Sequence, residues 1–249
     1  MTLDERLWKT FNKALGQYQL IDEGDHILVG LSGGKDSLLL TEFLARRQRI
    51  HVPRFTVEAL HVRMENIRYE SDTSYLEHFC QELNVPLHIV TTAFPTANDT
   101  SAIAPDGFPS GKKKPACFLC SWQRRKQLFN LAQELGCNKI ALGHHQDDIL
   151  HTTLMNLCFQ GQFSTMPAKL KMQKMPLTVI RPLCLCKEAD IRSYAEGQKY
   201  QKQIKRCPYE HDTNRHAAAE LFAHFEQLNP EARYSIFHAL ESSDKLTEY

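Results

Sequence analysis

A glycine-rich stretch near the amino terminus carries the residues best suited to bind phosphate. It reads Ser32-Gly33-Gly34-Lys35-Asp36-Ser37. An apolar run at 27–31 precedes it and helix-forming residues follow it. A strand that ends in a glycine turn and continues into a helix presents backbone N–H groups and the positive end of a helix dipole to an anion. Lys35 adds positive charge and the serines add hydrogen-bond donors, whereas Asp36 beside an anion predicts a metal ion. The spacing is not that of a Walker A loop.

Cysteines supply the second chemical feature. Cys117 and Cys120 have C-x-x-C spacing, and we expect a helix over 121–135 that carries Arg124 and Arg125. Two thiolates at a helix start could bind a metal or cluster, but the same spacing fits a redox pair or half a zinc site. The arginines could reach phosphates or could be solvated.

A polar cluster follows the expected strand at 139–142. It reads Gly143-His144-His145-Gln146-Asp147-Asp148. Paired carboxylates that follow a strand and open a helix suit Mg²⁺ coordination or the positioning of a nucleophile. N-capping by one of the two aspartates is the alternative. Later in the chain, Cys207 falls in a non-helical turn over 204–209.

Composition indicates a cytosolic globular protein. The chain has 249 residues, 42% hydrophobic and 24% charged, with a net charge of +1 and eight cysteines. A net charge near zero argues neither for nor against a nucleic-acid partner, and any basic surface must be local. Apolar runs stay well short of the roughly 20 residues of a membrane span. Eight cysteines in a cytosolic chain favour metal or redox chemistry over disulfides.

Hydrophobic periodicity predicts an α/β fold with a doubly wound, parallel, five-stranded sheet and helices on both faces. The expected strands are 27–31, 55–62, 87–91, 139–142 and 177–180. The expected helices are 3–20, 37–49, 71–83, 121–135, 149–159, 187–196 and two after 214. We expect one domain over 1–249, with an N-terminal helix in 1–24, the α/β core in 25–200, and a cysteine turn and helices in 201–249. Ligands of such sheets bind at the carboxyl ends of the strands. His61, at one such end, is either an adenine contact or a surface residue.

Two long irregular segments, 92–116 and 161–175, carry lysines. The lysines are Lys112, Lys113, Lys114, Lys169, Lys171 and Lys174. They could hold an RNA backbone or lie on solvated loop tips.

The stretch over 32–37 resembles the PP-loop of the N-type ATP pyrophosphatases, with motif S-G-G-x-D-S, which split ATP between the α and β phosphates and adenylate a carbonyl oxygen. The other motifs follow in order: Cys117-x-x-Cys120 with Arg124-Arg125, Gly143-His144-His145-x-Asp147-Asp148, Arg181-Pro182-Leu183 and Cys207. Over roughly 20–245 the chain therefore resembles the TtcA family, the tRNA 2-thiocytidine synthetases. That resemblance implies ATP, Mg²⁺ and a [4Fe–4S] cluster as cofactors. It also implies tRNA as substrate, a sulfur donor such as a cysteine desulfurase, and a homodimer as one option.

Site roles carried over from this resemblance are as follows. The nucleotide contacts would be Ser32, Gly33, Gly34, Lys35, Asp36, Ser37, His61 and Gly143. The catalytic groups would be Asp36, Lys35, Asp147 and Arg124, with Asp148 on Mg²⁺. The cluster ligands would be Cys117, Cys120 and Cys207, called the cysteine triad below. The expected activity is adenylation of the C2 oxygen of an anticodon-loop cytidine, followed by sulfur transfer.

Several alternatives remain open at this point. The triad could bind zinc with His211 as a fourth ligand, or Cys117 or Cys120 could carry a persulfide. A lysidine-synthetase-like ligase would use the PP-loop and leave the triad idle, and a non-catalytic sensor of ATP or metal would make no product. Glu210 stands where the TtcA family often has a further cysteine. Among the remaining cysteines, we expect Cys80, Cys137 and Cys158 to be buried, while Cys184 and Cys186 stay as additional ligand candidates.

Overall fold

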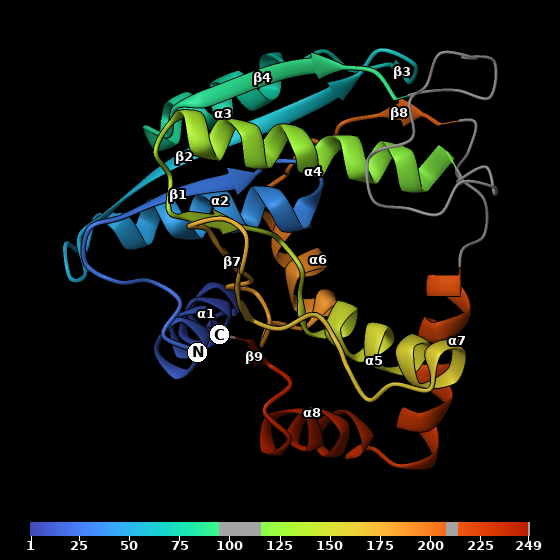
Figure 1. Cartoon of the computed structure of the whole chain (residues 1–249). Coiled ribbons are helices and arrows are strands. Elements are labelled where there is room, and N and C mark those ends of the chain that lie inside the picture. Colours follow the sequence, from blue (N-terminus) through green and yellow to red (C-terminus); the bar gives the residue numbers. More distant parts are fainter. Residues whose placement is uncertain (95–115, 208–213, 249) are drawn as a thin grey trace.

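A computed structural model describes residues 1–94, 116–207 and 214–248, with a seven-stranded sheet at the centre (Figure 1). The strands are β1 (Asp25–Gly30), β2 (Phe55–Met64), β4 (Leu87–Thr92), β5 (Lys139–Ala141), β6 (Lys169–Lys171), β7 (Thr178–Ile180) and β9 (Thr247–Glu248). Their order is β4-β2-β1-β5-β7-β6-β9, and all pairs from β4 to β7 are parallel. The predicted α/β fold and its five parallel strands are confirmed. The sheet is larger than expected, because β6 pairs antiparallel with β7 and parallel with β9.

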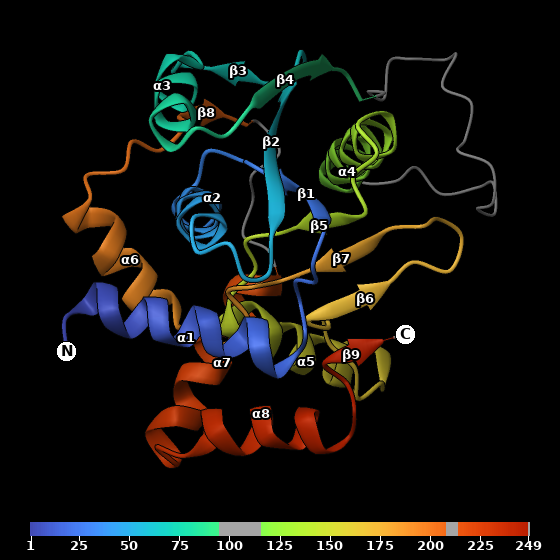
Figure 2. The ribbon, with the colours of Figure 1, turned by 90° about the vertical axis from the view of Figure 1, so that its left-hand side faces the viewer.

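Helices cover both faces of the sheet, as predicted. They are α1 (Leu3–Gln17), α2 (Lys35–Gln48), α3 (Ser74–Leu83), α4 (Ala116–Glu134), α5 (Gln146–Gln160), α6 (Glu188–Gly197), α7 (Asn214–Leu228) and α8 (Ala232–Ser242). Figure 2 shows α2 and α3 on one face and α4 on the other. None of the described helices is long and apolar enough to cross a membrane.

The core lies on both sides of the central strands because a covered parallel sheet buries both faces. Ile27 and Val29 of β1 join the larger cluster with Phe11 of α1 and Phe43 of α2, whereas Leu28 joins a second cluster beneath α4. The rings of Phe11 and Phe43 meet edge to face with centroids 5.4 Å apart. This burial explains why the strand is a continuous apolar run in the sequence.

A second, two-stranded sheet lies apart from the first. It pairs β3 (Arg68–Tyr69) with β8 (Lys205–Arg206) in antiparallel fashion. The pairing brings the chain just before Cys207 beside the segment that follows β2. Polar residues dominate both strands, so their sequence carries no periodic strand signal.

The carboxyl edge of the main sheet gathers the polar motifs. Leu31 N donates to Leu60 O at 2.9 Å, and Leu142 N donates to Ile180 O at 3.0 Å. The residue after β1 is therefore still bonded to β2, and the residue after β5 is still bonded to β7. Helices α2 and α5 begin within a few residues of these strand ends. Both the PP-loop and the polar cluster over 143–148 therefore lie at this edge.

Candidate nucleotide site and cysteine triad

The PP-loop leaves the amino terminus of α2 open. Gly33 has φ +79°, which favours glycine, and Gly34 is the N-cap residue. No side chain of the described residues caps this end by a hydrogen bond. Ser37 Oγ instead turns back to donate to Gly34 O at 2.9 Å and lies 3.1 Å from Ser32 Oγ. The N–H groups of the first turn are thus left for an anion.

Gly143 is required by the close approach of two loops. A Cβ placed on it would lie 3.1 Å from the backbone C and O of Asp36 and from Ser37 N. Backbone atoms cannot swing aside as the end of a flexible side chain can. The loop after β5 consequently packs directly on the first turn of α2.

A cavity of about 510 Å³ lies between these loops. Its lining includes six predicted site residues: Ser32, Lys35, Asp36, Ser37, Gly143 and Asp148. The lining also includes residues that the sequence analysis gave no role: His144, His145, His151, Thr152 and Glu188. The histidines could have been found, because two belong to the polar run directly after β5. Glu188 could not have been found from the sequence, because it lies at the start of α6, about 40 residues after the polar cluster.

Lys35 is held between two carboxylates. Its Nζ lies 3.1 Å from Asp36 Oδ1 and 3.1 Å from Glu188 Oε1. Burial alone would lower the pKa of Lys35, but Asp36 and Glu188 outweigh it and raise the pKa. The ammonium group is therefore charged and already oriented beside the open end of α2.

Asp148 faces the cavity from the first turn of α5. It forms a capping box with His145: the His145 N–H donates to Asp148 Oδ2 at 3.1 Å, and His145 Nδ1 accepts from the Asp148 N–H at 3.4 Å. His145 Nε2 lies 3.5 Å from Asp148 Oδ2 and 3.8 Å from Asp36 Oδ1. The N-capping alternative is thus realised in part, with His145 as the N-cap, while Asp148 still lines the cavity.

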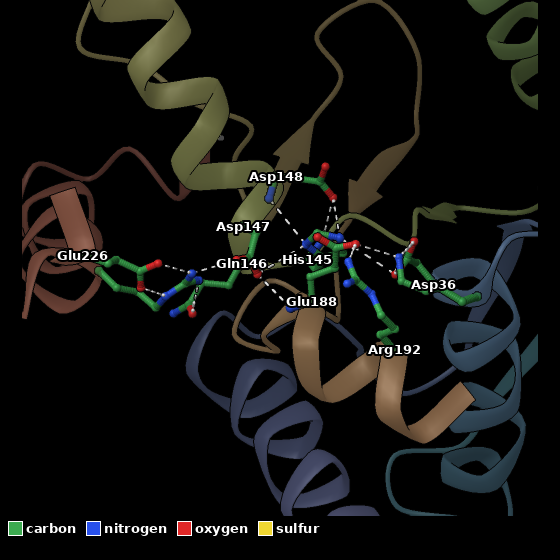
Figure 3. Close-up of polar contacts among 10 residues, drawn as sticks. Asp36, His145, Gln146, Asp147, Asp148, Glu188, Arg192 and Glu226 are labelled. Atoms are coloured by element: carbon green, nitrogen blue, oxygen red, sulfur yellow. Dashed lines mark hydrogen bonds and ion pairs between the residues drawn. The ribbon is translucent and has the colours of Figure 1, made fainter. Parts of the chain in front are cut away.

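Asp147 points the other way (Figure 3). Its Oδ1 lies 2.7 Å from Arg233 Nη2, and its Oδ2 accepts from the Glu188 N–H at 2.8 Å. Burial would raise the pKa of Asp147, but the bonds from Arg233 and Glu188 outweigh it and hold the pKa below its usual range. This carboxylate joins α5 to α6 and α8 and is not among the described residues that line the cavity.

Arg181 contacts His144, one of the histidines that line the cavity. It is buried, its Nη1 donates to Pro167 O, and its Nε donates to His144 Nδ1 at 3.3 Å. Burial lowers the pKa of Arg181 to about 10. The Arg181-Pro182-Leu183 motif therefore positions the loop after β5.

His61 holds the backbone that enters the PP-loop. It is 1% exposed, and its Nδ1 lies 2.8 Å from Leu31 O, so this nitrogen carries the donated proton. Burial lowers the pKa of His61. Its Nε2 is buried and makes no hydrogen bond to the described residues. The surface interpretation is wrong, whereas the adenine contact stays a prediction.

Arg124 lies on α4 and, within the described residues, forms no hydrogen bond or ion pair with Lys35 or Asp36. Its Nη2 donates to Tyr69 Oη at 3.0 Å, and its Nε is buried without a hydrogen-bond partner among the described residues. Tyr69 Oη in turn accepts from Met64 N at 3.2 Å. Arg124 thus ties α4 to β3, and its phosphate role stays a prediction.

The cysteines separate by burial. Four are buried core residues, namely Cys80, Cys137, Cys184 and Cys186. Burial raises the pKa of Cys80 to about 12, of Cys137 to about 11 and of Cys186 to about 12, and it raises that of Cys184 further. A thiol that resists ionisation is a poor ligand. Cys158 is exposed near the end of α5, so its predicted burial is wrong.

The cysteine triad retains solvent access. Cys117 is exposed and Cys120 is half-buried near the start of α4, which begins five residues earlier than expected. Cys207 is half-buried, and both it and Cys120 pack against the core cluster beneath α4. Residues 1–94, 116–207 and 214–248 contain no group of three His, Cys, Asp or Glu side chains poised around one metal ion. His211 and Lys112–Lys114 lie outside the described residues.

The chain matches a known protein family and named relatives over most of its length. The PP-loop domain family matches residues 3–214. The tRNA-cytidine(32) 2-sulfurtransferase of Pseudomonas putida is 33% identical over 241 residues, which cover 96% of this chain and 84% of the relative. The enzyme of that name from Shewanella oneidensis is 33% identical over 242 residues, covering 97% and 75%. The chain belongs to this PP-loop sulfurtransferase family. The resemblance to the TtcA family is confirmed.

A solved structure supports the same fold for this sulfurtransferase family member. The U34-tRNA thiolase NcsA from Methanococcus maripaludis, solved with its [4Fe–4S] cluster, matches with a TM-score of 0.72 at 24% identity. The match covers 96% of this chain and 78% of that chain.

Proposed function

We propose that this sulfurtransferase family member thiolates tRNA at the C2 position of an anticodon-loop cytidine and uses ATP to activate the C2 oxygen. The observation that carries the proposal is the cavity beside the uncapped amino terminus of α2, walled by Lys35, Asp36 and Asp148. Relatives 33% identical to the chain bear the name tRNA-cytidine(32) 2-sulfurtransferase, which makes cytidine 32 the expected target.

ATP would bind with its phosphates over the PP-loop. The described cavity wall holds one lysine, Lys35, against three carboxylates: Asp36, Asp148 and Glu188. A triphosphate beside such a wall requires a cation. Mg²⁺ typically takes one or two carboxylates and completes its shell with phosphates and water. The first candidate ligand is the buried Asp36 Oδ1, which is ion-paired with Lys35 Nζ at 3.1 Å but accepts no hydrogen bond from the described residues, and Asp148 is the second.

Adenylation is the step that this arrangement would serve. The cytosine C2 oxygen attacks the α-phosphorus, the α–β bridge bond breaks, and pyrophosphate leaves. Lys35 and the α2 N–H groups stabilise the charge that develops on the phosphate oxygens. Sulfide then attacks C2 as the nucleophile, the C–O bond breaks, and AMP leaves with the former base oxygen.

The cysteine triad fits an iron–sulfur cluster on chemical grounds. Thiolates are the ligands that such clusters require, and Cys117 and Cys120 lie near the amino terminus of α4 with access to solvent. The four buried thiols with raised pKa leave Cys158 as the other accessible cysteine, at the far end of α5. Bound by three cysteines, a [4Fe–4S] cluster would supply an iron with an open position for sulfur. The structure of NcsA with its cluster supports this proposal.

The target base would have to enter the cavity at the carboxyl edge of the sheet. Anticodon-loop bases are unstacked easily, and an enzyme reaches them more readily than paired bases. Lys171 and Lys174 are exposed in the connection that leads into β7, at the opposite end of that strand from the cavity, and would contact RNA backbone away from the target base. Lys169 Nζ already donates to Gln19 O at 2.7 Å. A cysteine desulfurase is the expected class of sulfur donor.

The test is a product assay. Protein purified without oxygen is incubated with ATP, Mg²⁺, sulfide and an unmodified tRNA, and the digested nucleosides are analysed by mass spectrometry. We expect 2-thiocytidine from wild type and from Cys158→Ala, and none from Cys207→Ala. Binding of ATP without AMP, pyrophosphate or 2-thiocytidine would identify a sensor instead. Equal product from the two cysteine variants would refute the role of the triad.

A further inference from the structure

Gln203 lies on the PP-loop although it is far from it in the sequence. Its backbone N–H donates to Gly33 O at 3.0 Å, and its side chain is 7% exposed. A Cβ placed on Gly33 would lie 2.4 Å from Gln203 Cγ and 2.8 Å from Gln203 Cβ. The stem of Gln203 thus covers the glycine whose positive φ shapes the loop.

The amide end of Gln203 is fixed from the other side. Gln203 Oε1 accepts from Ser71 Oγ at 3.1 Å, and Gln203 Nε2 donates to Asp72 O. Ser71 Oγ also accepts from the Ile204 N–H at 2.8 Å. One serine therefore binds both the side chain of Gln203 and the backbone that follows it.

The same contacts continue to the cysteines. The Glu70 N–H donates to Ile204 O at 2.9 Å, and Tyr69 pairs with Lys205 where β3 meets β8. Cys207 follows β8 directly, four residues after Gln203. Tyr69 Oη also accepts from Arg124, which lies one turn beyond Cys120 on α4.

We propose that Gln203 is a positioning residue that couples the PP-loop to Cys207. An anion bound by the PP-loop backbone restrains Gly33. The side chain of Gln203, whose stem covers Gly33 and whose amide is bound by Ser71 and Asp72 O, passes that restraint to the short segment that ends in Cys207. Nucleotide binding and the placement of the third thiolate thereby become linked. The inference rests on the proposed nucleotide site and adds a residue that neither binds ATP nor ligates a metal.

The experiment uses the full chain without iron or zinc on its cysteines. Cys207 is alkylated with iodoacetamide in the absence and presence of Mg–ATP, and the rate is read by peptide mass spectrometry with exposed Cys158 as the internal reference. For wild type we expect ATP to slow Cys207 alkylation by about fivefold, the low end of measured site-to-site coupling. Gln203→Ala should reduce that effect to less than about twofold at saturating ATP.

Matched variants separate coupling from general damage. Gln201→Ala removes an exposed glutamine from the same segment and should behave as wild type. Gln203→Glu keeps the stem and the acceptor for Ser71 but loses the donor to Asp72 O, so it should retain part of the ATP effect. Ser71→Ala removes the hydrogen bonds of Ser71 Oγ to Gln203 Oε1 and to the Ile204 N–H without changing a residue of the segment that carries Gln203. This variant should also reduce the effect of ATP on Cys207 alkylation, and it replaces Gln203→Ala in the experiment if that variant fails to fold.

Three results would count against the inference in distinguishable ways. Equal protection of Cys207 by ATP in wild type and Gln203→Ala would show that the nucleotide shields the thiol directly. Measured ATP binding with no change at Cys207 in wild type would overturn this inference alone. Failure of wild type to bind ATP would overturn the proposed nucleotide site as well.

Discussion

Asp147 and Asp148 are sequence neighbours that should respond in opposite ways to the same substitution. Asp147 is 12% exposed and bound to Arg233 and to the Glu188 N–H, whereas Asp148 is 24% exposed and lines the cavity. We predict that Asp147→Asn lowers the stability and spares the chemistry. Asp148→Asn should spare most of the stability and greatly slow the formation of AMP and pyrophosphate.

The magnitude for Asp147→Asn follows from its two hydrogen bonds. Each involves a charged group and contributes about 1.5–3 kcal/mol. Asparagine keeps one neutral acceptor, and Arg233 keeps Glu226 at 2.9 Å, so the loss should be about 2–3 kcal/mol rather than the full sum. For a chain of this size that lowers Tm by about 4–12 °C. Asp148→Asn loses a capping contact, about 1 kcal/mol.

The assay combines urea unfolding with release of pyrophosphate in the presence of tRNA. Below its denaturation temperature, Asp147→Asn should react within about threefold of wild type, and Asp148→Asn at least about 100-fold more slowly. Because its bonds hold the pKa of Asp147 below 3.8, the stability that this carboxylate contributes is present above pH 3.8 and is lost as the pH falls through the lower folded pKa. The difference in stability between wild type and Asp147→Asn should therefore shrink in acid. A stable but inactive Asp147→Asn protein would refute the reasoning.

Three further substitutions test other parts of the site. Gly143→Ala should weaken ATP binding about tenfold in a titration, because its Cβ would press on the Asp36 backbone at 3.1 Å. His61→Gln should flatten the loss of wild-type stability as the pH falls below 6.5, measured by urea unfolding. Burial lowers the pKa of His61, so in wild type only the unfolded chain takes up that proton. Cys186→Ala should leave the iron content unchanged, since that thiol is buried in the core; loss of iron would make it a ligand.

Local features of the sequence predicted much of the fold and the PP-loop. The strand at 27–31 is apolar throughout because both of its faces are covered, and the glycines at 33 and 34 follow it directly. A strand, a glycine turn and a helix start define the anion site within one short segment. The geometry around Ser32 to Ser37 was predictable for that reason.

Features that depend on distant partners were not predictable. The sequence cannot distinguish Asp147 from Asp148, because the distinction comes from Arg233, 86 residues away. Strand β6 has only the three residues Lys169–Lys171 and exists because β7 and β9 pair with it. Cys158 was expected to be buried because it falls on an apolar face or at the end of an element, but this end of α5 is exposed, with Leu157 and Phe159 exposed beside it.

The most direct test of the central claim follows an oxygen atom. A tRNA with ¹⁸O at the C2 position of the target cytidine is incubated with the protein, ATP, Mg²⁺ and sulfide under conditions that yield 2-thiocytidine. If the PP-loop site adenylates the base, each turnover should place one ¹⁸O in the phosphate of AMP, as read by mass spectrometry. Thiolation that leaves AMP unlabelled, or that places the ¹⁸O in pyrophosphate, would contradict activation of the C2 oxygen at the α-phosphorus.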